Sequence, residues 1–183
     1  STNASDVICW EDCLIVDCAS DDGAGGIMAN EFVSLTGCTF YGNRATSTGG
    51  GAVLYKGGEV FNCMFRGNTA GSAGSQLRSG PIDELSEIDH CNIEGGESGI
   101  SVLFGAWNYG AHNIDADPNF ADAGDLDGAD DRFGTADDGL VLVAPSTSID
   151  AGTAASSTLD LRKATRSQGA APDIGAYETT PVH

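Results

Sequence analysis

Nine of the 24 residues from position 115 to position 138 are aspartates, and Arg132 is the only basic residue among them. Carboxylates packed this closely repel one another, so they either bind cations or project into solvent. In Asp125-Leu-Asp127-Gly128 and in Gly134-Thr-Ala-Asp137-Asp138-Gly139, the aspartates accompany glycines that permit tight turns. Hard carboxylate oxygens in such an arrangement are the ligands that Ca²⁺ prefers, as at the start of an EF-hand loop.

The sequence predicts Ca²⁺ as a cofactor, held by five aspartates and by backbone carbonyl oxygens. The five are Asp125, Asp127, Asp130, Asp137 and Asp138. A solvated acidic loop is the alternative, because most runs of charge form one. Bound cations would order this segment against the last coil of a fold built from stacked coils, and would close that end of the stack.

No catalytic grouping is evident elsewhere in the sequence. A β-helical polysaccharide lyase needs a basic proton acceptor beside its calcium, and an inverting glycosidase needs two carboxylates about 6.5–9.5 Å apart. None of the eight Lys and Arg residues recurs beside an aspartate of the repeat, and GxSxG and HExxH are absent. His90, His112 and His183 are isolated in the sequence. We expect no enzyme, with a polysaccharide lyase or glycoside hydrolase as the alternative.

A repeat of about 25 residues supplies the elements that position these groups. Its most regular feature is a Cys-x-(Ile/Phe) triplet, which begins at Cys13, Cys38, Cys63 and Cys91, at intervals of 25, 25 and 28 residues. A fixed period of this size indicates stacked coils. The alternation within each triplet is typical of a strand with one buried face, so cysteine and phenylalanine would point inward.

Each repeat predicts a strand, a sharp corner at Gly-Asn and a second strand. Stacking would place Phe40 over Phe65 in an apolar core. Asn43 and Asn68 would stack at the corner, with their amides bonded to backbone or to each other. The prediction is an all-β, parallel β-helix of about four short coils with almost no helix.

We divide the chain into four parts on this basis. Residues 1–6 form an N-terminal arm, 7–114 the β-helix coils, 115–139 the Asp-rich calcium-binding segment, and 140–183 a C-terminal cap. The first coil begins almost at once, so its open end would need a cover, for which a neighbouring copy of the protein is one candidate. Such a head-to-tail contact would generate filaments.

The six cysteines lack the paired CxxC spacing of a zinc site. Cys9 and Cys18 fall outside the ladder and are the best candidates for a disulfide, whereas a stripe of buried thiols is the alternative for the rest. Secretion fits this cysteine content. A net charge of −19 disfavours nucleic acid and anionic lipid as partners. No apolar run approaches the roughly 18 residues of a membrane helix, and no signal peptide stands at Ser1, as expected of a mature form.

Several motifs resemble known families. Gly50-Gly-Ala-Val53 and Phe65-Arg-Gly-Asn68 resemble the GGA(I/V) and FxxN repeats of polymorphic outer-membrane proteins. Asp115-Ala-Asp-Pro-Asn-Phe120, Ser148-Ile-Asp-Ala-Gly152 and Asp173-Ile-Gly-Ala-Tyr-Glu178 resemble the closing segment of extracellular proteins of the choice-of-anchor Q type. Thr147 stands where the family usually has proline, and Lys163 stands where its DxxGxxR motif, here Asp160 to Arg166, has glycine. The resemblance implies a right-handed β-helix, an extracellular location and a calcium element in the acidic segment.

The charged members of the resembling motifs are Asp150, Arg166 and Asp173, which we interpret as a structural ion-pair cluster that ties the tail onto the coils. A catalytic role for them is the alternative. Trp107 and Tyr109 are candidate glycan contacts, although aromatic residues more often lie in a core or interface. Asn3 begins a glycosylation sequon.

The sequence thus predicts a non-catalytic, calcium-stabilised protein of the cell surface with a structural or adhesive role, which associates with itself into filaments. The alternative is a module that binds or degrades polysaccharide. Surface polysaccharide is accordingly the other candidate partner, through the stacking of sugars on aromatic faces.

Overall fold

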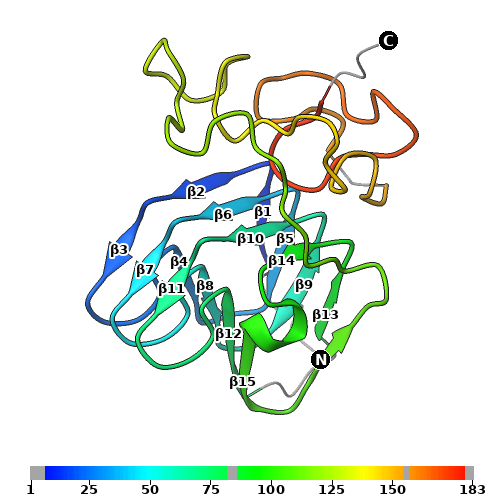
Figure 1. The fold of residues 1–183 in the computed structure, drawn as a ribbon. Coiled ribbons are helices and arrows are strands. Elements are labelled where there is room, and N and C mark those ends of the chain that lie inside the picture. The colour runs from blue at the N-terminus through cyan, green and yellow to red at the C-terminus, as the bar shows by residue number, and fades with distance from the viewer. Residues whose placement is uncertain (1–6, 82–85, 155–156, 180–183) are drawn as a thin grey trace.

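The computed structural model describes residues 7–81, 86–154 and 157–179. Residues 7–81 and 86–114 form a parallel β-helix of about four coils, and the later described residues lie as a largely irregular layer against one of its sides (Figure 1). All strand pairs are parallel, and each strand pairs with its equivalent in the next coil. The fold predicted from the repeat is therefore confirmed.

Four sheets make the sides of the coils. The first contains β1 (Ile8–Glu11), β5 (Val33–Thr36), β9 (Gly58–Phe61), β13 (Ser86–Asp89) and β16 (Trp107–Tyr109) in that order. The second contains β2 (Leu14–Val16), β6 (Thr39–Tyr41), β10 (Met64–Arg66) and β14 (Asn92–Ile93). The third contains β3 (Ala19–Ser20), β7 (Arg44–Ala45) and β11 (Thr69–Ala70). The fourth contains β4 (Ile27–Ala29), β8 (Ala52–Leu54), β12 (Leu77–Pro81) and β15 (Ile100–Phe104). A short 3-10 helix, η1 (Gly96–Gly99), precedes β15.

The core consists of rows of equivalent residues that run along the stack. In the second sheet, Ile15, Phe40, Phe65 and Ile93 occupy one row. The Phe40 and Phe65 rings stack at 4.5 Å with an interplanar angle of 5°, and both are fully buried. Stacked rings recur because the period returns the same side chain to the same place in the next coil.

The cysteine ladder forms a second row of the same core. The Cys38 amide donates to the Cys63 thiol at 3.4 Å, and the Cys63 amide donates to the Cys91 thiol at the same distance. Burial raises the pKa of the Cys63 thiol, so it stays protonated and unreactive. The four ladder positions thus carry small apolar side chains inside the coils.

All six cysteines are free thiols, so the predicted bridge between Cys9 and Cys18 is not formed. Cys9 lies on β1, opposite Ser34 of β5. Cys18 lies at the corner after β2, where its amide donates to Asn43. The two residues therefore belong to different sides of the first coil, which their closeness in the sequence does not reveal.

The asparagine corner is a buried chain of amides. Asn68 Oδ1 accepts from both the backbone amide and the side-chain amide of Asn43, at 3.0 and 2.9 Å. The two side chains also donate to the carbonyl oxygens of Ile15 and Phe40. Each asparagine therefore bonds a backbone amide and a carbonyl oxygen of the preceding coil at the corner.

The C-terminal residues cover a side of the β-helix rather than its end. Leu142 and Ile174 pack on Met64 of β10, and Ala176 and Tyr177 form a cluster with Leu14 of β2. The Ala176 amide also donates to Thr39 of β6 at 2.9 Å. The second sheet is consequently buried on both faces. The predicted closure of the stack's C-terminal end is thus wrong for the described part of residues 140–183, because the outward positions of this sheet offer an apolar surface.

No helix among the described residues is long and apolar enough to cross a membrane.

Candidate functional site

Asp138 is the structural centre of the acidic segment. Its carboxylate is fully buried and accepts from the amides of Gly134 and Thr135, at 2.7 and 3.2 Å. The Thr135 hydroxyl oxygen lies 2.9 Å from it, and the Tyr177 hydroxyl donates to it from the lateral layer. Burial and this contact raise the pKa of Tyr177. The two amides and the Tyr177 hydroxyl therefore fix the Asp138 carboxylate at the centre of the loop.

The other predicted calcium ligands differ in their surroundings. The Thr135 hydroxyl oxygen also lies 2.8 Å from Asp137 Oδ1 and 3.5 Å from Asp130 Oδ1, and its single proton serves one of these carboxylates at a time. Its hydrogen bond to Asp137 lowers the pKa of that carboxyl. Asp125 is exposed and Asp127 is half-buried. Within the described residues, no three carboxylates of this segment have oxygens that all lie within 4.8 Å of one another. The structure therefore gathers Asp130, Asp137 and Asp138 around one hydroxyl, and does not bring all five predicted ligands to one point.

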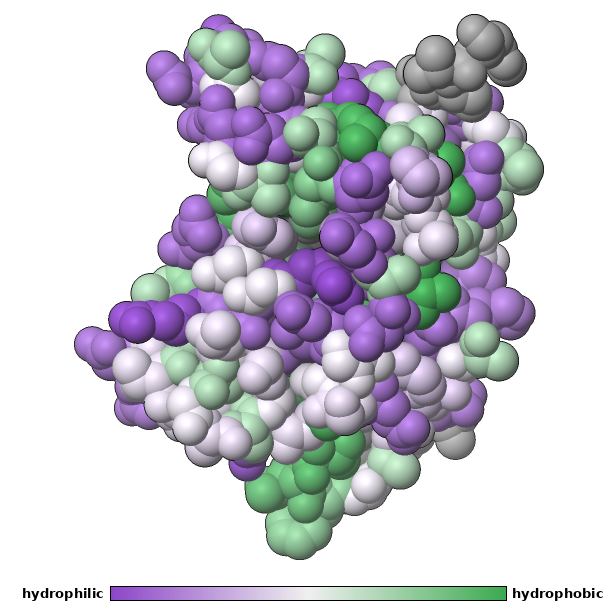
Figure 2. Space-filling model, viewed as in Figure 1, coloured by the Kyte–Doolittle hydropathy of each residue, from purple (hydrophilic) through white to green (hydrophobic). Residues whose placement is uncertain are grey.

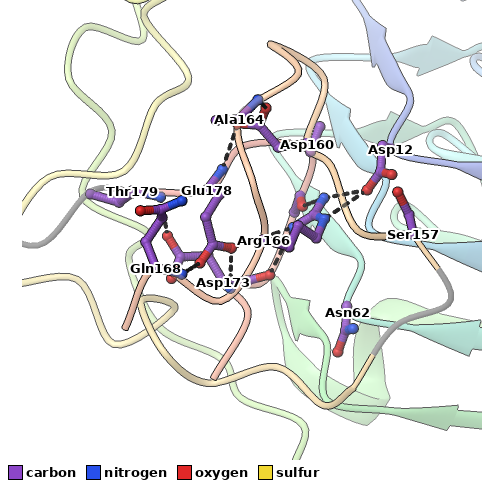
Figure 3. A network of polar contacts seen from close by, with 12 residues as sticks. Asp12, Asn62, Ser157, Asp160, Ala164, Arg166, Gln168, Asp173, Glu178 and Thr179 are labelled. Atoms are coloured by element: carbon purple, nitrogen blue, oxygen red, sulfur yellow. Dashed lines mark hydrogen bonds and ion pairs between the residues drawn. The ribbon is translucent and has the colours of Figure 1, made fainter. Parts of the chain in front are cut away.

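Arg166 joins the lateral layer to the first coil (Figure 3). Its Nε donates to Asp12 Oδ1 at 2.9 Å, and its Nη2 contacts the same carboxylate and donates to the Gly175 carbonyl at 2.9 Å. The Glu178 carboxylate lies 3.7 Å from Nη1. The Arg166 side chain is only 3% exposed, so this ion pair operates largely out of water.

The predicted ion pairs among Asp150, Arg166 and Asp173 are wrong, because Arg166 pairs with the carboxylates of Asp12 and Glu178 and reaches Asp173 only at its backbone carbonyl, at 3.5 Å. The Asp173 carboxylate accepts from the amides of Asp150 and Thr179, at 2.8 and 2.7 Å. Asp150 holds a left-handed backbone conformation and accepts from the Ala171 amide. These two aspartates therefore fix turns of the lateral layer, and the link to the coils is made by Arg166 alone of the three.

Buried carboxylates recur throughout this network. Glu178 accepts from the amides of Gln168 and Asp173, both at 2.9 Å, and Asp160 accepts from those of Ala164 and Glu178. Burial raises the pKa values of Asp173 and Glu178, although hydrogen bonds from these amides oppose the change. Irregular chain has many unpaired amides, and these side chains satisfy them.

The end of the stack at the first coil exposes core positions. Ile8 and Trp10 belong to the rows of the buried Val33 and Leu35, yet they are 40% and 38% exposed. A largely apolar cavity of about 570 Å³ opens there, lined by Trp10, Cys13, Ile15 and Ile27 and by Phe133 and Leu161 of the later segments. Among the described residues, β1, β2, β3 and β4 each pair on one edge only.

The opposite end of the stack shows the same feature. Trp107 and Tyr109, the two predicted glycan contacts, lie on β16 in core rows and pack against the core, half-buried. Leu103 and Phe104 of β15 are 47% and 68% exposed, and the lower end of the molecule in Figure 2 is correspondingly hydrophobic. The aromatic rings are thus part of the core at its open end. Asn3 lies outside the described residues.

Comparison of the chain with protein-family models, curated proteins and solved structures finds no match. The structure supports the fold that the family resemblance implies, a parallel β-helix, and it has about four coils.

Sequence reasoning missed one grouping, Asp89, His90 and His112, because the two histidines stand 22 residues apart. In the structure, Asp89 Oδ2 lies 3.3 Å from His90 Nδ1 and 2.9 Å from His112 Nδ1. The imidazole rings stack with centroids 4.3 Å apart. The available signal was the repeat itself, since a separation close to one coil brings two corners together.

Proposed function

We propose that this chain is a non-catalytic, extracellular β-helix protein with a structural or adhesive role, and that its copies associate end to end. The observation that carries the proposal is the exposure of core positions at both ends of the stack. Trp107 occupies the row of Ile8, and Tyr109 occupies the row of Trp10. A second copy docked head to tail would continue both rows with apolar contacts.

The backbone favours the same partner. Each of the four sheets ends in a first-coil strand at one edge; at the other edge, among the described residues, β11, β15 and β16 are open and β14 is bridged by Ile114. Strands with an unpaired edge accept another strand, and a copy of this chain presents strands with the matching parallel spacing. Because the two contacting surfaces differ, the association does not close and yields a filament.

The extracellular location and the finer family assignment rest on the motifs shared with the choice-of-anchor Q type. Two of those motifs lie in the lateral layer that covers the second sheet, where Asp173 and Glu178 fix its turns. This position agrees with a segment that completes a β-helix. We propose that the chain belongs to that group of surface proteins.

A charge at the first-coil end tests the association. Trp10→Asp is expected to weaken self-association at least tenfold, a loss of about 1.4 kcal/mol or more, because it would bury an unpaired carboxylate in the contact. Analytical ultracentrifugation over a concentration series measures this, and negative-stain microscopy shows whether filaments form.

Tyr55→Asp is the matched control, because Tyr55 is 43% exposed in the turn between β8 and β9, away from both ends. It should associate as the parent does. A parent protein that stays monomeric at all concentrations, or an equal loss in both variants, contradicts the proposal.

We also propose that Ca²⁺ stabilises residues 115–139 through the aspartates that retain free oxygens. Asp138 is satisfied by protein donors, so Asp125, Asp127, Asp130 and Asp137 are the better candidates. These four side chains lie in a segment with a single arginine, where cations relieve mutual repulsion.

Calcium at about 100 times its dissociation constant should raise the melting temperature by roughly 5–10 °C, and a chelator should reverse this. Differential scanning calorimetry checks the effect. Asp127→Asn should reduce the shift, whereas Asp21→Asn, an exposed aspartate of the first coil, should leave it intact. A melting temperature that does not respond to calcium or to chelator rules out this role.

A further inference from the structure

Asp89, His90 and His112 lie at stacked corners near the end of the β-helix. Asp89 is the last residue of β13, and His90 forms the corner before Cys91 in a left-handed conformation, with φ of 51°. β13 pairs with β16, and His112 follows β16 in the next turn. Parallel pairing therefore brings the turn after β16 beside the end of β13.

The carboxylate of Asp89 is oriented by the backbone of that turn. Its Oδ1 accepts from the His112 amide at 3.0 Å, which leaves Oδ2 toward the two imidazole rings. Gly110 provides the space, because a Cβ there would lie 2.1 Å from Asp89 Cγ. The Asp89 side chain is 13% exposed. Burial opposes its charge, but hydrogen bonds from the His112 ring and from the two histidine amides lower its pKa overall.

His90 Nδ1 is a buried polar atom without a hydrogen-bond partner among the described residues. Asp89 Oδ2 lies 3.3 Å away, yet the two atoms do not make a hydrogen bond. A buried nitrogen in this state costs free energy, which a ligand that accepts its lone pair would recover. The same nitrogen belongs to a group in which one donor atom from each of the three residues lies within 4.8 Å of the others.

The two oxygen–nitrogen distances fit a small transition-metal ion, and its binding would turn the two imidazole rings, which stack 18° from parallel, until both Nδ1 lone pairs point at it. Ligand atoms about 2.0–2.2 Å from a tetrahedral Zn²⁺ are roughly 3.3 Å from one another. The Asp89 oxygen is 3.3 and 2.9 Å from the two histidine nitrogens. Imidazole nitrogen favours zinc over calcium or magnesium, and two histidines with one carboxylate leave a fourth position for water. The net charge of −19 further attracts cations.

We propose that Asp89, His90 and His112 form a zinc site that ties the corner between β13 and β14 to the turn after β16. The metal links consecutive coils near the end of the stack, where β16 has an unpaired edge among the described residues. It is separate from the acidic segment, which supplies carboxylates alone.

The site is tested by titrating metal-free protein with zinc. Calorimetry measures the affinity, and elemental analysis after dialysis counts the bound ions. A Cys9→Ser, Cys18→Ser parent removes the two exposed thiols, and excess Mg²⁺ occupies exposed carboxylates. The parent should bind one zinc ion. His112→Ala and His90→Asn should each weaken zinc binding at least about tenfold, because removing a metal ligand lowers the affinity at least as much as removing a residue that supports a ligand.

His183→Ala is the control for the loss of a histidine that the proposed site does not use, and it should bind as the parent does. His112 is 65% exposed, so its replacement leaves the fold intact, and asparagine tolerates the left-handed conformation at position 90. Zinc should also slow amide exchange in β16 of the parent and not of the His112 variant. Absence of zinc binding by the parent, or unchanged affinity in either histidine variant, would overturn the proposal.

Discussion

Replacing Arg166 by methionine is expected to lower the free energy of unfolding by about 3–5 kcal/mol. The Asp12 carboxylate would remain beneath the lateral layer without its cation, with its side chain 12% exposed. The carbonyl of Gly175 would also lose its donor, because Arg166 Nη2 serves both groups. Urea unfolding of the single variant, followed by tryptophan fluorescence, measures the change.

A double-mutant cycle separates the pair from the general effect of truncation. Asp12→Asn with Arg166→Met should lose less than the sum of the two single changes, because the second substitution removes a charge already left unpaired. Lys56→Met is the control, since Lys56 pairs with Glu31 at a surface where both side chains are at least half exposed. This change should cost less than about 1 kcal/mol. Additive losses at positions 12 and 166 would show that the pair does not couple the tail to the first coil.

The coils could be predicted from the sequence because their physics is local and repeated. A 25-residue period returns Phe65 to the place of Phe40, and the same register carries Cys63 over Cys38. One correct assignment of an inward residue therefore fixes the others of its row. The sequence gives a weaker signal for the side of the β-helix that the C-terminal residues cover. Leu14, Thr39 and Met64 fill the variable middle position of the triplet, and only their packing shows that this face is covered.

The pairing of Arg166 could not be predicted, because its partner Asp12 lies 154 residues away and outside any motif. Sequence proximity favoured Asp150 and Asp173, whose oxygens satisfy backbone amides instead. The five predicted calcium ligands of the acidic segment do not meet at one point for a related reason. Regular spacing along the chain does not show that Asp138 turns inward to Tyr177 while Asp125 stays in solvent.

Core substitutions should show how stability is distributed along the stack. Phe65→Ala is expected to lower the free energy of unfolding by about 3–5 kcal/mol, because Phe65 is fully buried between Phe40 and Ile93 and leaves a cavity that the stacked backbone cannot close. Ile15→Ala alters the same row at the open end, where the side chain is only half-buried. It should cost clearly less in the monomer.

The comparison also bears on association, because Ile15 lines the apolar cavity at the first-coil end. If a second copy covers this end, the cost of Ile15→Ala should rise with protein concentration, whereas that of Phe65→Ala should stay constant. Thermal unfolding at low and high concentration measures both. Equal losses of stability at the two positions in the monomer would contradict a core that is less well packed toward its open end. They would show that Ile15 is buried by its own chain.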